Sequence, residues 1–141
     1  MFAHNRIDIL LTMPAKFHKI LVVDDDPVMV KLLESTLTDK GFDVMVTQEA
    51  ADGLQKAINN KPDLIILDVM MPVINGFNFC RLLKSEQSRQ DVPIILLTSR
   101  DEMEDIQIGL EMGADAYLTK PVNMDELFKT IKVVEGLRKD Q

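Results

Sequence analysis

Residues 21–27 read LVVDDDP, an aliphatic run followed by three aspartates and a proline. Two comparable runs, LIIL at residues 64–67 and IILL at residues 94–97, are also continuous and rich in branched side chains. Continuous runs of this kind are typical of parallel strands that are covered on both faces. The three stretches therefore predict the buried centre of a parallel sheet, with a row of carboxylates at the end of its first strand.

Weaker strands are predicted at residues 43–47 and 116–118, and helices in the segments between the strands. Apolar residues recur in those segments at helical spacing, which places them on one face. The predicted faces are Val30, Leu33 and Leu37; Phe79, Leu82 and Leu83; Met103, Ile106 and Leu110; and Leu127, Ile131 and Val134, with a weaker helix at residues 49–60. Five strands that alternate with five helices predict an α/β open parallel sheet with right-handed crossovers.

The composition indicates one globular domain and limits the classes of partner. A chain of 141 residues with 46% hydrophobic content can bury one core without disulfides. Its net charge of −7 and the lack of a basic block argue against nucleic acid or a membrane surface as a direct partner, and favour proteins or cations. Cys80 is the single cysteine, which predicts a reducing, cytoplasmic location. No segment approaches the roughly 20 apolar residues of a membrane span.

Polar residues stand at the carboxyl ends of the predicted strands. Asp24 and Asp25 follow the first strand, Asp68 the third, Thr98 the fourth and Lys120 the fifth. In an open parallel sheet, ligands bind just beyond these ends. Three neighbouring carboxylates are tolerable only with a cation between them, and Mg²⁺ is the hard ion that suits carboxylate oxygens. The formal charges of the three aspartates, one Mg²⁺ and the lysine sum to zero, so we expect a magnesium site.

Four motifs, LVVDDDP, PDLIILDVMMPVINGF, VPIILLTS and GADAYLTKP, resemble those of the response-regulator receiver domain of two-component signalling. The resemblance extends from about residue 19 to residue 139, so we expect a receiver domain at residues 19–141, preceded by an N-terminal extension at residues 1–18. It implies a flavodoxin-like five-stranded sheet in the order 2-1-3-4-5. It also implies a switch that is phosphorylated by a histidine kinase or a phosphotransfer protein.

The resemblance assigns a role to each residue of the strand-end set. It implies phosphorylation of Asp68, Mg²⁺ binding by Asp24, Asp25, Asp68 and the backbone carbonyl of Met70, phosphoryl contacts from Thr98 and Lys120, and a switch in which Tyr117 swings inward after Thr98. The residue types fit this chemistry independently. A carboxylate is a competent nucleophile for phosphoryl transfer, and Mg²⁺ with a lysine neutralises the charge on the transferred group.

The resemblance also implies how the signal leaves the domain. Phosphorylation is expected to change the surface formed by the helix near residues 103–110, the strand at residues 116–118 and the helix near residues 127–134. In the family this surface binds a downstream protein target or a fused output domain, or pairs two receivers as a homodimer. No direct binding of nucleic acid or membrane by this chain is expected.

Several of these residues also have a purely structural interpretation. Asp26 before Pro27 is expected to cap a helix, because aspartate at the N-cap and proline at the first helical position are both favoured. Asp24 and Asp25 remain after that single cap is assigned, which favours the metal interpretation. Tyr117 is explained as well by packing as by switching. Lys120 is either a solvated lysine or a positioned one, and the Pro121 that follows favours the second.

Two further features of the sequence carry expectations of their own. Met70 and Arg100 lie two residues after the phosphoacceptor and after the switch threonine, where polar or acidic residues accompany rapid loss of the phosphate in the family. An apolar and a cationic side chain there predict a long-lived phosphoprotein. Residues 1–12 are either a misassigned translation start, because Met13 would make an ordinary start, or a short added helix.

Two other classes of function compete with the switch. A pseudo-receiver, an interaction module that is never phosphorylated, would lack Asp25, Asp68 or Lys120, and all three are present. A phosphate-handling enzyme on a related sheet is the other class. A flavin-binding protein would need an anion cradle after the first strand, where this chain has aspartates. A phosphatase of the aspartate type would need a second acid at position 70. The sequence therefore favours the switch.

Overall fold

The computed structural model describes residues 17–89, 91–99, 110–111 and 113–139. Five parallel strands form one sheet in the order β2-β1-β3-β4-β5. The strands are β1 (Lys19–Val23), β2 (Asp43–Thr47), β3 (Leu64–Asp68), β4 (Ile94–Thr98) and β5 (Ala116–Thr119). All five predicted strands and the expected strand order are confirmed.

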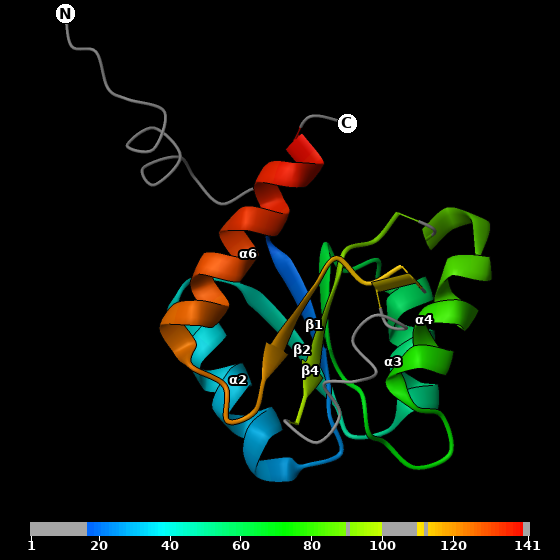
Figure 1. Ribbon diagram of the computed structural model, residues 1–141, viewed down its shortest axis with the longest axis horizontal. Coiled ribbons are helices and arrows are strands. Elements are labelled where there is room, and N and C mark those ends of the chain that lie inside the picture. The colour runs from blue at the N-terminus through cyan, green and yellow to red at the C-terminus, as the bar shows by residue number, and fades with distance from the viewer. Residues whose placement is uncertain (1–16, 90, 100–109, 112, 140–141) are drawn as a thin grey trace, which may run out of the picture.

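Helices cover both faces of the sheet, as the continuous hydrophobic runs predicted. They are α2 (Pro27–Asp39), α3 (Ala50–Asn59), α4 (Gly76–Ser85) and α6 (Met124–Lys139), with the short 3₁₀ helix η1 (Gln87–Arg89). Figure 1 shows α2 and α6 on one side of the sheet and α3 and α4 on the other. Of the helical face predicted from Met103, Ile106 and Leu110, the first two residues lie outside the described residues, and Leu110 is helical with 43% of its surface exposed.

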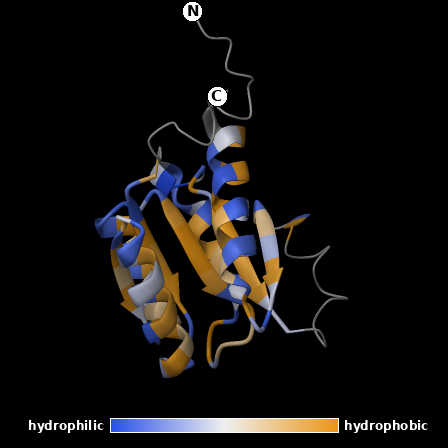
Figure 2. Cartoon of the chain, turned by 90° about the vertical axis from the view of Figure 1, so that its left-hand side faces the viewer, coloured by the Kyte–Doolittle hydropathy of each residue, from blue (hydrophilic) through white to orange (hydrophobic). Residues whose placement is uncertain are grey.

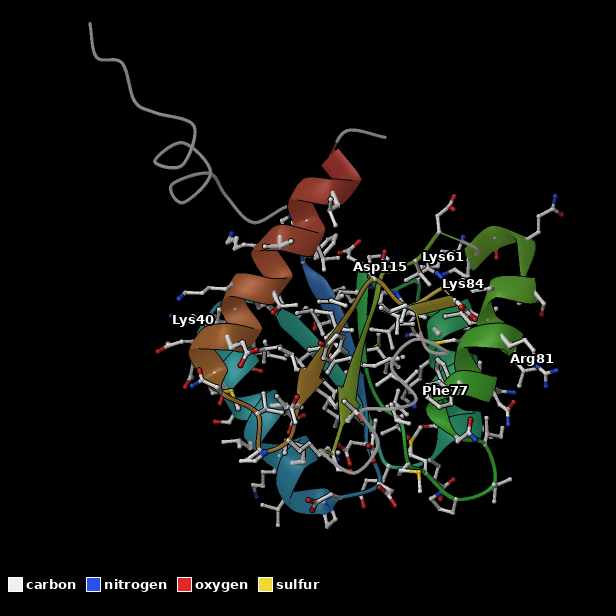
Figure 3. All side chains as sticks on the ribbon, in the orientation of Figure 1. Lys40, Lys61, Phe77, Arg81, Lys84 and Asp115 are labelled. Carbon is white, nitrogen blue, oxygen red and sulfur yellow. The ribbon has the colours of Figure 1, made fainter. Side chains whose placement is uncertain are left out.

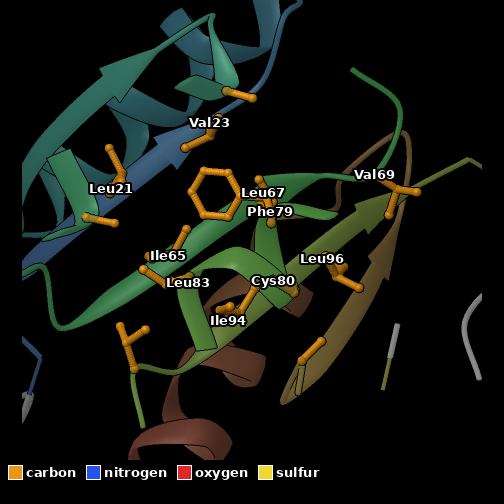
Figure 4. Packing of buried hydrophobic residues seen from close by; sticks show 14 of the residues in the cluster. Leu21, Val23, Ile65, Leu67, Val69, Phe79, Cys80, Leu83, Ile94 and Leu96 are labelled. Atoms are coloured by element: carbon orange, nitrogen blue, oxygen red, sulfur yellow. The ribbon is translucent and has the colours of Figure 1, made fainter. Parts of the chain in front are cut away.

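The core consists of two layers that the sheet separates. Successive side chains of a strand point to opposite faces, so Leu21 and Val23 pack toward α3 and α4, whereas Ile20 and Val22 pack toward α2 and α6. Figure 4 shows the first layer, in which Phe79 lies among the strand side chains. The strands form the hydrophobic centre of the molecule in Figure 2. The strand ends, where the polar residues lie, are therefore supported by packing on both faces of the sheet.

One predicted helical face is partly wrong. Leu82 was expected to share the buried face of Phe79 and Leu83, but its side chain is 42% exposed. Cys80 is fully buried in its place. At 100° per residue, position 82 lies at the edge of a face centred between positions 79, 80 and 83, so the spacing alone did not separate the two candidates.

The expected N-cap of α2 is present, and a second side-chain cap begins α4. Asp26 accepts a hydrogen bond from the backbone N–H of Val28 at 2.9 Å, with Pro27 at the first helical position. Asn75 caps α4 by accepting from the N–H of Asn78 at 2.9 Å. Among the described residues, no helix is both long and apolar enough to cross a bilayer.

Acidic side chains at the amino end of the sheet bind backbone N–H groups. Asp63 Oδ2 accepts from His18 and Lys19, each at 2.9 Å. Asp115 Oδ2 accepts from Ile94 at 2.8 Å, and Figure 3 shows Asp115 at this end of the molecule. These carboxylates supply acceptors for donors at the starts of strands, which would otherwise lack a partner in the sheet.

Candidate functional site

The parallel register brings the predicted site residues together at the carboxyl end of the sheet. Val23 of β1 is paired with Leu67 of β3, and Asp68 of β3 with Leu97 of β4. The residues that follow these positions therefore emerge at one edge. One carboxylate oxygen from each of Asp24, Asp25 and Asp68 lies within 4.8 Å of the others, as the strand-end pattern predicted.

Asp24 is the most deeply buried of the three aspartates, with no exposed surface. Its Oδ1 accepts a hydrogen bond from the N–H of Asp26 at 2.9 Å. Its Oδ2 lies 3.1 Å from Lys120 Nζ in an ion pair, yet it accepts no hydrogen bond from the described residues. A buried carboxylate oxygen of this kind is costly unless a cation completes its shell.

Asp68 is also buried, with 4% of its surface exposed. Its Oδ1 lies 3.2 Å from Lys120 Nζ and accepts from the N–H of Met70 at 3.3 Å. Burial first, and then the negative charge of Asp24, raise the pKa of Asp68 from its ordinary 3.8 to about 7, although Lys120 acts against both. The three aspartates therefore do not all carry full charge at neutral pH without a further cation.

Lys120 supplies positive charge to this cluster. Burial favours its neutral form, but the charges of Asp68 and Asp24 outweigh that effect and raise its pKa. Its backbone N–H donates to the carbonyl of Thr98 at 2.7 Å, and its peptide bond to Pro121 is cis. The lysine is thus positioned between two aspartates, as predicted, and is not a solvated side chain.

The loop between β3 and α4 packs closely against the backbone of Asp68. The N–H of Gly76 donates to the carbonyl of Val69 at 2.8 Å. A Cβ atom at Gly76 would lie 2.8 Å from the carbonyl oxygen of Asp68 and 2.9 Å from the Cα of Val69. Only glycine fits there without a backbone shift. Sequence reasoning missed Gly76, although the Asn75-Gly76 pair is a turn signal.

Thr98 and Tyr117 occupy different environments on neighbouring strands. Thr98 is 2% exposed at the end of β4, and its hydroxyl donates to the carbonyl of Ser99 at 3.2 Å. Tyr117 is 39% exposed on β5, beside Leu96 of β4. Their switch roles stay predictions. The side chain of Met70 is 61% exposed, and Arg100 lies outside the described residues.

The donor set fits Mg²⁺. The ion prefers hard oxygen ligands, keeps several waters and is usually bound through one or two carboxylates. Asp24 and Asp68 are buried, Asp25 is exposed toward solvent, and Asp24 Oδ2 lacks a hydrogen bond among the described residues. A divalent cation at this position would satisfy that oxygen and offset the crowding that raises the pKa of Asp68.

Comparisons with known proteins agree with this geometry. The pattern of the response regulator receiver domain matches residues 20–132. The transcriptional regulatory protein PhoP of alkaline phosphatase synthesis in Bacillus subtilis is 43% identical over 82% of this chain and 48% of its own length. The chain thus spans about half the length of the curated relatives it matches.

Two solved structures extend the likeness to three dimensions. The chemotaxis response regulator CheY4 of Vibrio cholerae has 34% identity and a TM-score of 0.79, covering 84% of this chain and 99% of its own. The receiver domain of a sensor histidine kinase from Pseudomonas aeruginosa, solved with magnesium in its active site cleft, has 28% identity and a TM-score of 0.77, covering 85% and 98%. This chain belongs to the response-regulator receiver domain family.

Proposed function

We propose that the protein is a phosphorylation-activated signalling switch that accepts a phosphoryl group on Asp68 in a Mg²⁺-dependent reaction. One observation carries the proposal. Oxygens of Asp24, Asp25 and Asp68 lie within 4.8 Å of one another, and Lys120 Nζ lies 3.1 Å from Asp24 and 3.2 Å from Asp68. Such a set of charges suits the binding and transfer of a phosphoryl group.

The chemistry assigns a task to each side chain. An oxygen of ionised Asp68 attacks phosphorus as the bond from phosphorus to the donor breaks, and the donor leaves with that electron pair. Lys120, already beside Asp68, offsets the charge on the phosphoryl oxygens, and the Thr98 hydroxyl contacts one of them. Asp24, Asp25, Asp68 and the carbonyl of Met70 would hold Mg²⁺, which supplies the remaining positive charge.

Membership of the family supports a proposal for the donor and the receiver of the signal. The phosphoryl donor is a histidine kinase or a phosphotransfer protein in the cytoplasm. On phosphorylation Thr98 moves inward and Tyr117, now 39% exposed, follows it, which changes the surface of β5, α6 and the segment before β5. That surface acts on a downstream protein or a fused output domain, or pairs two copies, and the chain itself contacts neither nucleic acid nor membrane.

Mass spectrometry of the intact protein tests the proposal. Incubation with Mg²⁺ and acetyl phosphate should add the mass of one phosphoryl group to the parent and none to Asp68→Asn. Phosphate that persists in Asp68→Asn would refute the site. A parent that never gains the mass would favour the pseudo-receiver instead.

The lifetime of the phosphoprotein is part of the proposal. The exposed Met70 side chain offers no useful hydrogen bond to an attacking water. Met70→Asn with Arg100→Glu should therefore speed loss of the phosphate by about tenfold or more, equivalent to ~1.4 kcal/mol in the barrier. Decay within about twofold of the parent, at saturating Mg²⁺, would contradict this by the same arithmetic.

A further inference from the structure

The solvent-facing side of α6 carries two exposed aliphatic residues one helical turn apart. Val133 is 61% exposed and Leu137 is 59% exposed. The buried residues of α6, Leu127, Ile131 and Val134, lie on the other side of the helix. Side chains four residues apart are neighbours on a helix surface, so Val133 and Leu137 form one apolar strip, here called the α6 strip.

The described chain begins directly against α6. The backbone N–H of Phe17 donates to Glu135 Oε2 at 2.7 Å, and Glu135 is 6% exposed. The ring of Phe17 is itself buried in the core layer that α6 covers. The next two N–H groups are bound by Asp63. The described chain therefore starts at Glu135, which lies between Val133 and Leu137 in the sequence but on the opposite side of α6.

The preceding segment has a suitable composition for this strip. Residues 7–11 read IDILL, the densest aliphatic run in a stretch that otherwise mixes apolar and polar side chains. Residues 1–16 contain two basic side chains and one acidic one, whereas the whole chain has a net charge of −7. The segment is thus opposite in net charge to the chain as a whole, and its fit to the α6 strip rests on the apolar run.

The reach of the chain is sufficient. Glu135 and the α6 strip lie on opposite sides of a helix about 10 Å across. The five residues 12–16 span up to roughly 17 Å when extended, so residues 7–11 can pass around the helix. A short tether raises the effective concentration of such a segment to about the millimolar range, so even a weak apolar contact is populated.

We propose that residues 7–11 bind the α6 strip of the same chain, so that the N-terminal extension is an intramolecular partner of the C-terminal helix. The proposal rests on contacts at the amino end of the sheet and is independent of phosphorylation at Asp68. Because α6 belongs to the proposed output surface, the extension then decides whether the solvent side of that helix is free for another protein.

Disulfide trapping tests the position of the segment. Leu10→Cys combined with Leu137→Cys should form an intramolecular disulfide with oxidised glutathione about tenfold faster than the same pair in a chain that also carries Ile7→Ser and Ile9→Ser, because only the first chain gains from the apolar contact. The two chains have the same tether, so they differ in binding and not in reach. Native Cys80 does not compete, because burial raises its pKa to about 12. Equal rates, or disulfides formed mainly between two chains, would overturn the proposal.

Hydrogen exchange provides a second test without engineered cysteines. A chain that starts at Met13 retains every described residue, so its fold is expected to persist. Its amides in residues 130–139 should exchange faster than those of the full chain, while α2 is unchanged. Equal exchange in the two chains would refute binding by residues 7–11. Phosphorylation by acetyl phosphate, measured on both chains, keeps this outcome distinct from that of the proposed function.

Discussion

Both ends of the parallel sheet carry acidic side chains, but the groups that surround these carboxylates differ. At the amino end, Asp63 accepts two backbone N–H groups at 2.9 Å and Asp115 accepts one at 2.8 Å. At the carboxyl end, Asp24 and Asp68 lie close together with Asp25, share one lysine, and leave Asp24 Oδ2 without a hydrogen bond among the described residues. The carboxylates at the amino end are bound by backbone N–H groups and stabilise the fold. Those at the carboxyl end carry more negative charge than the lysine beside them can neutralise.

Burial and hydrogen bonding together distinguish a carboxylate that stabilises the fold from one that is available to bind a cation or to react. A carboxylate that accepts backbone N–H groups gains charge-assisted hydrogen bonds, and its removal leaves those donors unpaired. A carboxylate that is crowded by others loses free energy in its ionised form. Removal of an acid should therefore destabilise the protein at the amino end and stabilise the metal-free protein at the carboxyl end.

The largest effect on stability is expected at the amino end. Asp63→Ala leaves the N–H groups of His18 and Lys19 without their carboxylate acceptor, so the free energy of unfolding should fall by about 2 to 3 kcal/mol. Urea unfolding measures this loss. A loss of less than about 0.5 kcal/mol would mean that water replaces the carboxylate at no cost, and the contrast between the two ends would fail.

The second-largest effect on stability is expected at Gly76, which packs closely against the backbone of Asp68. Gly76→Ala places a Cβ 2.8 Å from the carbonyl oxygen of Asp68, so it should destabilise the protein by about 2 kcal/mol and weaken Mg²⁺ binding. Gly136→Ala on α6 is the matched control, because nothing lies within 4 Å of its added Cβ. That change should be neutral or stabilising by up to about 1 kcal/mol. Equal effects of the two changes would contradict the packing described for Gly76.

A smaller effect of opposite sign is expected at Asp68. Its pKa rises from 3.8 to about 7 on folding, so the folded protein binds a proton that the unfolded chain has lost between these pH values. The stability of the metal-free protein must then fall as pH rises through this window. Asp68→Asn should therefore be more stable than the parent at pH 8 without divalent ions, by about 1 kcal/mol or roughly 3 °C in Tm.

Low pH and added Mg²⁺ provide two controls for the effect of Asp68→Asn on stability. Well below pH 3.8, where Asp68 is protonated in both folded and unfolded chains, the two proteins should have equal stability. Saturating Mg²⁺ should raise the Tm of the parent more than that of Asp68→Asn. A variant that is less stable than the parent at pH 8 would show that Asp68 is satisfied without a cation.

The strands and the clustering of the strand-end residues could largely be predicted, because both depend on local patterns that the fold places by rule, whereas the strand order was implied by the family resemblance. Hydrophobic runs fix the strands, and parallel pairing brings Asp24, Asp68 and Lys120 to one edge. Gly76 and Glu135 were missed because their importance lies in contacts with residues distant in the sequence. Leu82 was misplaced because helical spacing does not separate the centre of a face from its edge.

The most direct test measures how phosphorylation depends on Mg²⁺ in two variants, each of which lacks one acid from one end of the sheet. The yield of phosphoprotein from acetyl phosphate is measured by intact mass across a Mg²⁺ titration for the parent, Asp25→Ala and Asp63→Ala. Asp25→Ala should need about tenfold or more Mg²⁺ for half-maximal yield, since a lost ligand costs at least ~1.4 kcal/mol of binding. Asp63→Ala, although less stable, should keep the parent's midpoint at a temperature where it stays folded. Identical midpoints for Asp25→Ala and the parent, or phosphorylation without Mg²⁺, would contradict a metal-dependent phosphoacceptor site at the carboxyl end.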